Sequence, residues 1–192
     1  KLIAFITSLI TLTVIYKIAI HFMSKQQALI FICVLACTPM FGILSWIVTP
    51  DVPMMLCWAL AVLFIYKADT ENRHIWWGLA GIFTGLASDS KYTAVFILEG
   101  LFIYLIAKPD RWRRIFSIGI LLYALGFIIS IMPVFIWNNQ NDWASISFQT
   151  TQRAQGSSFS LKPQFPVAVM AIQLFLLLPW LFYYFLKSFR SS

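Results

Sequence analysis

The feature that most constrains the fold of this chain is its series of long apolar stretches. Hydrophobic residues make up 60% of the 192 residues and charged residues 11%, so a soluble domain would expose too much apolar surface. A membrane-spanning helix needs about 20 mostly apolar residues. Four stretches reach that length, at approximately 2–22, 27–49, 115–137 and 166–186. Three stretches are shorter, at approximately 53–67, 75–89 and 91–107. The sequence predicts an all-α, polytopic transmembrane helix bundle of about seven spans.

The net charge of +7 indicates membrane topology, although it would suggest nucleic acid as a partner in a soluble protein. With seven spans, ten basic residues fall on one side of the membrane and four on the other, and "KPDRWRR" (108–114) is the densest group. Basic residues are enriched in cytoplasmic loops. This bias predicts an outside N-terminus, and therefore at least one further span before Lys1. No nucleic-acid partner is expected.

Metal-binding residues are sparse in the sequence. Cys33, Cys37 and Cys57 lie inside apolar stretches, without the spacing of a zinc site. His21 and His74 lie in expected loops with no partner nearby in the sequence. We therefore predict packing cysteines and interfacial histidines, and no metal site.

The stretch "IVTPDVPMML" (47–56) places Asp51 between two prolines in an otherwise apolar region. Proline ends a helix, and a carboxylate is costly in lipid. One interpretation is an ordinary helix start in which Thr49 or Asp51 serves as the N-cap. The other is a functional site at a broken helix end, where freed backbone groups face a cavity or water. Sequence alone leaves both open.

Charged residues from three separate hairpin ends map to the same predicted outer side. They are Asp51, Asp89, Lys91, Asp142 and Arg153. A lysine at headgroup level is suited to bind phosphate. The alternative for "SDSKYT" (88–93) is that Asp89 and Lys91 simply neutralise each other at a tight turn.

Three further features concern the helices and the outer loop. Glu99 lies within a predicted span, where an acid is expected to face the bundle interior. Gly81 and Gly85 form a GxxxG pair, which predicts close approach of two helices. The polar segment 138–165 is predicted to be a long outer loop, either functional or flexible.

Three stretches together resemble a known family. They are "TPDVPMMLCWALAVLFIYKA", "WWGLAGIFTGLASDSKYTAVF" and "MPVFIWNNQNDWASISFQ". In this order they resemble the polyprenyl-phosphate-sugar-dependent glycosyltransferases of the GT-C type. The similarity is strongest to the bacterial protein-mannosyltransferase-like branch, which includes lipopolysaccharide galacturonosyl- and aminoarabinosyltransferases. It covers roughly residues 25 to 155.

The resemblance implies a multispanning enzyme of the bacterial inner membrane with its active site at the outer face. Its donor would be a sugar linked to a polyprenyl phosphate, and its acceptor a lipid, glycan or protein. An acidic group would take or orient the acceptor proton, and cations would balance the leaving phosphate. No cofactor is certain, although the acidic residues would allow a divalent metal.

The resemblance also implies roles for individual residues. Asp51 matches the family's acidic residue at the start of a span, and Lys91 the lysine that contacts the donor phosphate. Asn138, Asp142 and Trp143 match the motif that opens the outer loop and shapes a pocket. Arg153 is expected to be a second phosphate ligand.

One departure from the family pattern affects the expected activity. The principal catalytic carboxylate of these enzymes lies in the first outer loop, and the resemblance implies that this chain begins after that loop. We therefore expect residues 1–192 to be a single domain that is incomplete at both ends and inactive alone. The alternative to an enzyme is a segment of a secondary transporter or flippase, because broken helices and intramembrane acids also mark transporters.

Overall fold

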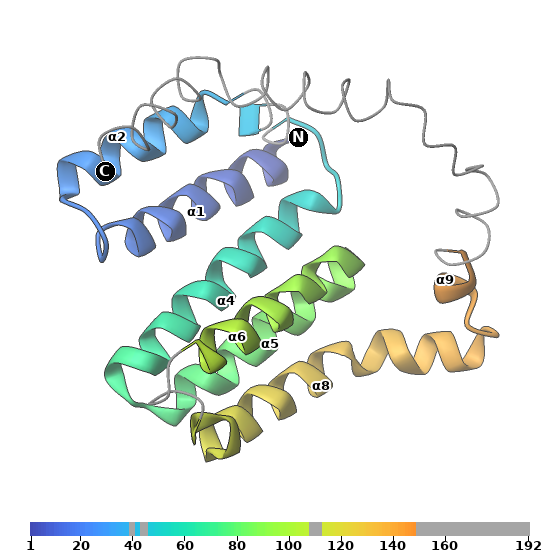
Figure 1. Cartoon of the computed structure of the whole chain (residues 1–192). Helices are drawn as coiled ribbons and strands as arrows, with labels where there is room; N and C mark the ends of the chain where they lie inside the picture. Colours follow the sequence, from blue (N-terminus) through green and yellow to red (C-terminus); the bar gives the residue numbers. More distant parts are fainter. Residues whose placement is uncertain (39–40, 43–45, 108–112, 149–192) are drawn as a thin grey trace, which may run out of the picture.

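The computed structural model describes residues 1–38, 41–42, 46–107 and 113–148, and Figure 1 shows their arrangement. Within these ranges all regular structure is helical, which confirms the predicted fold class for the described part of the chain. The elements are α1 (Leu2–Ala19), α2 (Lys25–Ala36), α4 (Asp51–Glu71), α5 (His74–Ser90), η1 (Tyr92–Val95), α6 (Phe96–Ile106), η2 (Arg113–Phe116), α8 (Ile118–Gln140) and α9 (Ala144–Ser147).

Local sequence signals account for several helix boundaries. Ser24 begins α2 in a reciprocal capping box with Gln27, and the Ser117 hydroxyl accepts the backbone N–H of Ile120 at the start of α8. Pro50 and Pro53 lie at the start of α4, where backbone N–H groups have no partner within the helix. The two prolines therefore fix where α4 begins.

The predicted spans agree with the structure only in part. Three described helices, α1, α4 and α8, are long and apolar enough to cross a membrane, at 18, 21 and 23 residues. The count of seven is not confirmed. α5 has 17 residues and α6 has 11, and the expected span 166–186 lies outside the described residues.

Hydropathy was wrong about the continuity of one expected span. The stretch 27–49 is not one continuous helix, because α2 ends at Ala36 and the Thr38 hydroxyl donates to the carbonyl of Leu35 at 2.7 Å. Pro39 follows in the sequence and disfavours helical backbone at the residue before it. The shorter expected span 53–67 lies inside the 21-residue α4, which is long and apolar enough to cross a membrane.

α5 lies between α4 and α8 and packs against both (Figure 1). A Cβ atom at Gly81 would collide with the carbonyl oxygen of Tyr123, and one at Gly85 would collide with the Ser130 side chain. Both contacts are with α8, so the predicted close approach at the GxxxG pair is confirmed. The same pairing shows that α5 and α8 run in the same direction, with Trp77 beside Gly119 at their beginnings.

Two further helices, α1 and α6, pack onto this three-helix layer. α1 packs along α4 through Val14, Ala59 and Leu63, and α6 contributes Leu101 and Leu105 to the core of α4, α5 and α8. The chain order of these contacts places the beginnings of α1 and α4 and the ends of α5 and α8 at one end of the bundle (Figure 1). We call this the Asp51 end.

Candidate functional site

An ion pair joins two separate helix ends at the Asp51 end. Lys91 Nζ lies 2.6 Å from Asp51 Oδ1, although the two residues are 40 positions apart in the sequence. Asp51 is the first residue of α4, and Lys91 is the residue directly after α5. The side chains are 28% and 45% exposed, so a ligand can reach both. The carboxylate also lies at the positive end of the α4 helix dipole.

This geometry contradicts the interpretation of Thr49 or Asp51 as an ordinary cap. α4 begins without any side-chain cap hydrogen bond. The carboxylate of Asp51 instead contacts the lysine, and the Thr49 hydroxyl is buried without a hydrogen-bond partner among the described residues. The alternative that Asp89 and Lys91 neutralise each other is also wrong, because Lys91 pairs with Asp51. Asp89 Oδ1 is buried and has no hydrogen-bond partner in the part of the chain that the structure describes.

Asn138 has a structural role at the end of α8. It lies inside α8, not in a loop, and is 2% exposed. Its Nδ2 donates to the carbonyl of Val134 at 3.0 Å, and its Oδ1 accepts the backbone N–H of Ser145 at 3.2 Å. Asn138 therefore ties α9 to the end of α8. The predicted outer loop 138–165 begins later than expected, and its residues from 149 on lie outside the described part.

Asp142 and Trp143 form the turn between α8 and α9. Both adopt left-handed backbone, with φ of 51° and 57°, and the Trp143 N–H donates to the carbonyl of Asn138 at 2.8 Å. The Trp143 ring lies edge-on against Phe135, with 5.2 Å between ring centroids. The structure thus places Asn138, Asp142 and Trp143 together as the framework of one turn. Arg153 lies outside the described residues.

Sequence reasoning missed a pocket near this turn. It lies between η1, the end of α8 and α9, has a volume of about 390 Å³, and is lined by Tyr92, Trp137, Ala144, Ser145 and Phe148. We call it the aromatic pocket. The available signal was the set of aromatic residues flanking the polar motifs "SDSKYT" and "WNNQNDW".

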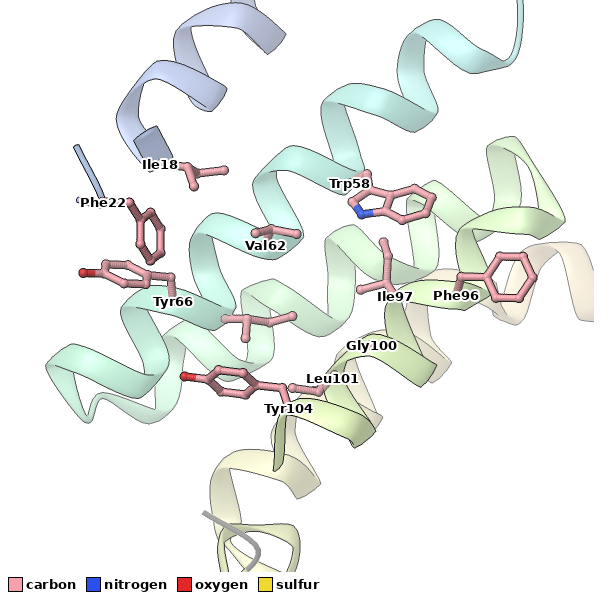
Figure 2. A pocket seen from close by; sticks show the side chains of 11 residues that line it. Ile18, Phe22, Trp58, Val62, Tyr66, Phe96, Ile97, Gly100, Leu101 and Tyr104 are labelled. Carbon is pink, nitrogen blue, oxygen red and sulfur yellow. The ribbon is translucent and has the colours of Figure 1, made fainter. Parts of the chain in front are cut away.

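A second, apolar groove of about 310 Å³ lies between the end of α1, α4 and α6 (Figure 2). It extends from Trp58 and Phe96, on the side of η1, towards Tyr66 and Tyr104 (Figure 2). The other lining residues are Ile18, Phe22, Val62, Ile65, Ile97, Gly100 and Leu101. The groove is therefore suited to a hydrocarbon chain. We call it the apolar groove.

Glu99 does not occupy the position that sequence reasoning expected. It lies in the first turn of α6 and is exposed on the surface of the described residues, so it does not face their interior. The main sequence argument for a transporter is thereby weakened. Within the described ranges, no group of three or more His, Cys, Asp or Glu residues is placed to hold a metal ion.

Comparison with known proteins gives one match. The family model of the dolichyl-phosphate-mannose-protein mannosyltransferases matches residues 1–137, which include Asp51 and Lys91 but not α9. No curated protein and no solved structure matches the chain significantly. The family points to a membrane glycosyltransferase that uses a lipid-phosphate-linked sugar. Since the match covers most of the sequence, the chain belongs to the dolichyl-phosphate-mannose-protein mannosyltransferase family.

Proposed function

We propose that this chain is part of an enzyme that transfers a hexose or pentose from a polyprenyl-phosphate carrier to a lipid, glycan or protein acceptor. The observation that carries the proposal is the Asp51–Lys91 pair, which places a carboxylate and a cation 2.6 Å apart at two helix ends. Glycosyl transfer from a lipid phosphate needs both charges. The cation balances the phosphate, and the carboxylate acts on the acceptor hydroxyl.

The proposed reaction assigns one task to each side chain. Lys91 binds the donor phosphate through its ammonium group. The acceptor hydroxyl attacks the anomeric carbon, the bond between that carbon and the phosphate oxygen breaks, and its electron pair leaves with the carrier phosphate. Asp51 accepts a hydrogen bond from the attacking hydroxyl and orients it, and the proton passes to the principal carboxylate that the family pattern puts outside residues 1–192. Arg153 would be a second phosphate ligand.

The apolar groove supports the assignment of a lipid carrier. Its Trp58 and Phe96 end lies on the side of η1, the segment that directly follows Lys91 (Figure 2). Thr93 of η1 also contacts the first turn of α4, with its hydroxyl 3.9 Å from Met54 Sδ. A polyprenyl phosphate could thus place its phosphate at Lys91 and its hydrocarbon chain along α4 and α6.

The charge asymmetry of the loops supports the orientation of the site. The proposed cytoplasmic side carries ten basic residues and the side of Asp51 and Lys91 carries four. We therefore place the Asp51 end at the periplasmic face of a bacterial inner membrane, where a carrier-linked sugar would meet its acceptor.

Substitution of Asp51 tests the proposal in the enzyme that contains this chain. Asp51→Asn should abolish sugar transfer while leaving binding of polyprenyl monophosphate detectable, because the phosphate ligand is retained. Glu71→Gln is the matched control, since this carboxylate lies at the other end of α4, where it accepts a hydrogen bond from Trp76. Transfer at the wild-type rate by Asp51→Asn would overturn the assignment of Asp51. A transporter would instead show carrier-dependent transport without any transfer.

A further inference from the structure

One of the three walls of the aromatic pocket lies outside the residues that the family model matches. α9 supplies Ser145, and Phe148 follows it; both positions lie outside residues 1–137. The three aromatic side chains remain open to solvent, with Tyr92 42%, Trp137 50% and Phe148 51% exposed. They are therefore available to a ligand and are not part of the protein core.

The lining of the pocket begins one residue after the proposed phosphate ligand. Tyr92 is the residue after Lys91, so their Cα atoms are about 3.8 Å apart. In a carrier-linked donor the sugar is bonded to the same phosphate that the lysine would bind. The donor sugar must therefore lie close to the Lys91 ammonium group, and the aromatic pocket is the candidate to hold it because its lining includes Tyr92, the next residue.

The chemistry of the lining matches a sugar ring. A pyranose presents one face of C–H groups and an edge of hydroxyl groups. The electron-rich faces of tyrosine, tryptophan and phenylalanine attract C–H groups, and the Ser145 hydroxyl can donate to or accept from a sugar hydroxyl. Small-molecule sites combine apolar and aromatic walls with a few polar groups in the same way.

We propose that the aromatic pocket binds the pyranose ring of the donor, with Trp137 and Tyr92 as its main contacts. The proposal rests on the proposed function and adds the position of the sugar to it. Asn138 and the turn at Asp142 and Trp143 are positioning residues in this account. They hold α9, and hence Ser145, against the end of α8 through hydrogen bonds of 2.8 and 3.2 Å to Asn138.

Binding measurements with two probes test this proposal on the full chain in lipid nanodiscs. The probes are polyprenyl monophosphate and the same carrier bearing glucose, mannose or galactose. Trp137→Ala should weaken binding of a glycosylated carrier by about two- to tenfold and leave binding of the bare carrier unchanged, as expected for the loss of one aromatic contact. Trp137→Phe retains a ring and should restore much of the affinity.

An aromatic side chain outside the pocket provides the control. Trp46 is 63% exposed and packs against Phe5, away from the pocket lining. Aromatic residues at a membrane interface also anchor a protein in the headgroup region, which is the rival role for Trp137. Trp46→Ala should therefore leave the binding of both probes unchanged.

The results separate the sugar pocket from the proposed function. Equal losses for glycosylated and bare carrier, or equal effects of Trp137→Ala and Trp46→Ala, would overturn the sugar pocket and favour membrane anchoring. The sugar pocket would also be overturned if the wild type bound every glycosylated carrier and the bare carrier with equal affinity. In that case the phosphate site at Lys91 would still stand. Absence of binding by both probes would refute the proposed function itself.

Discussion

The Asp51–Lys91 pair should contribute little to stability although it is central to the proposed site. At the permittivity of water, two unit charges separated by 2.6 Å attract each other by about 1.6 kcal/mol. Ordering a lysine side chain costs up to about 2 kcal/mol. The side chains are 45% and 28% exposed, so dissolved salt screens the attraction further. We therefore expect a coupling free energy below about 1 kcal/mol, as for surface ion pairs.

Ligand binding should respond much more strongly, and with opposite signs for the two residues. A hydrogen bond to a charged group contributes about 1.5–3 kcal/mol, so Lys91→Met should weaken binding of polyprenyl monophosphate by about 10- to 100-fold. Asp51→Asn removes the carboxylate that now competes for the ammonium group. This variant should bind the bare carrier as well as the wild type or slightly more tightly, by up to about fivefold.

A double-mutant cycle provides the assay. Unfolding free energies and polyprenyl-monophosphate affinities are measured for wild type, Asp51→Asn, Lys91→Met and the double variant. Lys1→Met is the control, because Lys1 is an exposed lysine at the same end of the bundle, at the start of α1. A coupling of about 3 kcal/mol or more in stability would indicate a structural salt bridge. Equal losses of affinity for Lys91→Met and Lys1→Met would show that general surface charge, and no phosphate site, had been measured.

Two further predictions concern the elements that hold the site in place. Gly81→Ala should lower the unfolding free energy by about 1–3 kcal/mol, because its Cβ would meet the Tyr123 carbonyl. Gly100→Ala is the control and should not destabilise the protein, because a Cβ at Gly100 has no neighbour within 4 Å. Thermal unfolding in detergent distinguishes the two variants. Asn138→Leu leaves the Ser145 N–H without its acceptor and should increase proteolysis between α8 and α9; an unchanged cleavage pattern would argue against this anchoring role.

Much of the helical framework was predictable because its signals are local. The apolar stretches required a helical membrane protein, Pro50 and Pro53 marked the start of α4, and the GxxxG pair indicated the contact between α5 and α8. Hydropathy was less successful with helix continuity. It joined 27–49 into one span although α2 ends at Ala36, since averaging over a window hides the effect of a single proline.

The sequence by itself determined that this protein is a bundle of apolar helices with charged groups gathered at one end. It could not decide which charges pair, because Asp89 and Asp51 are both acidic and only the packing of α4 on α5 brings Asp51 to Lys91. Tertiary structure also made Asn138 an internal support and left Trp137 open beside Tyr92. The hydrophobic pattern of a segment indicates which of its own residues are buried. The contact between Asp51 and Lys91, 40 residues apart, depends instead on how the helices pack.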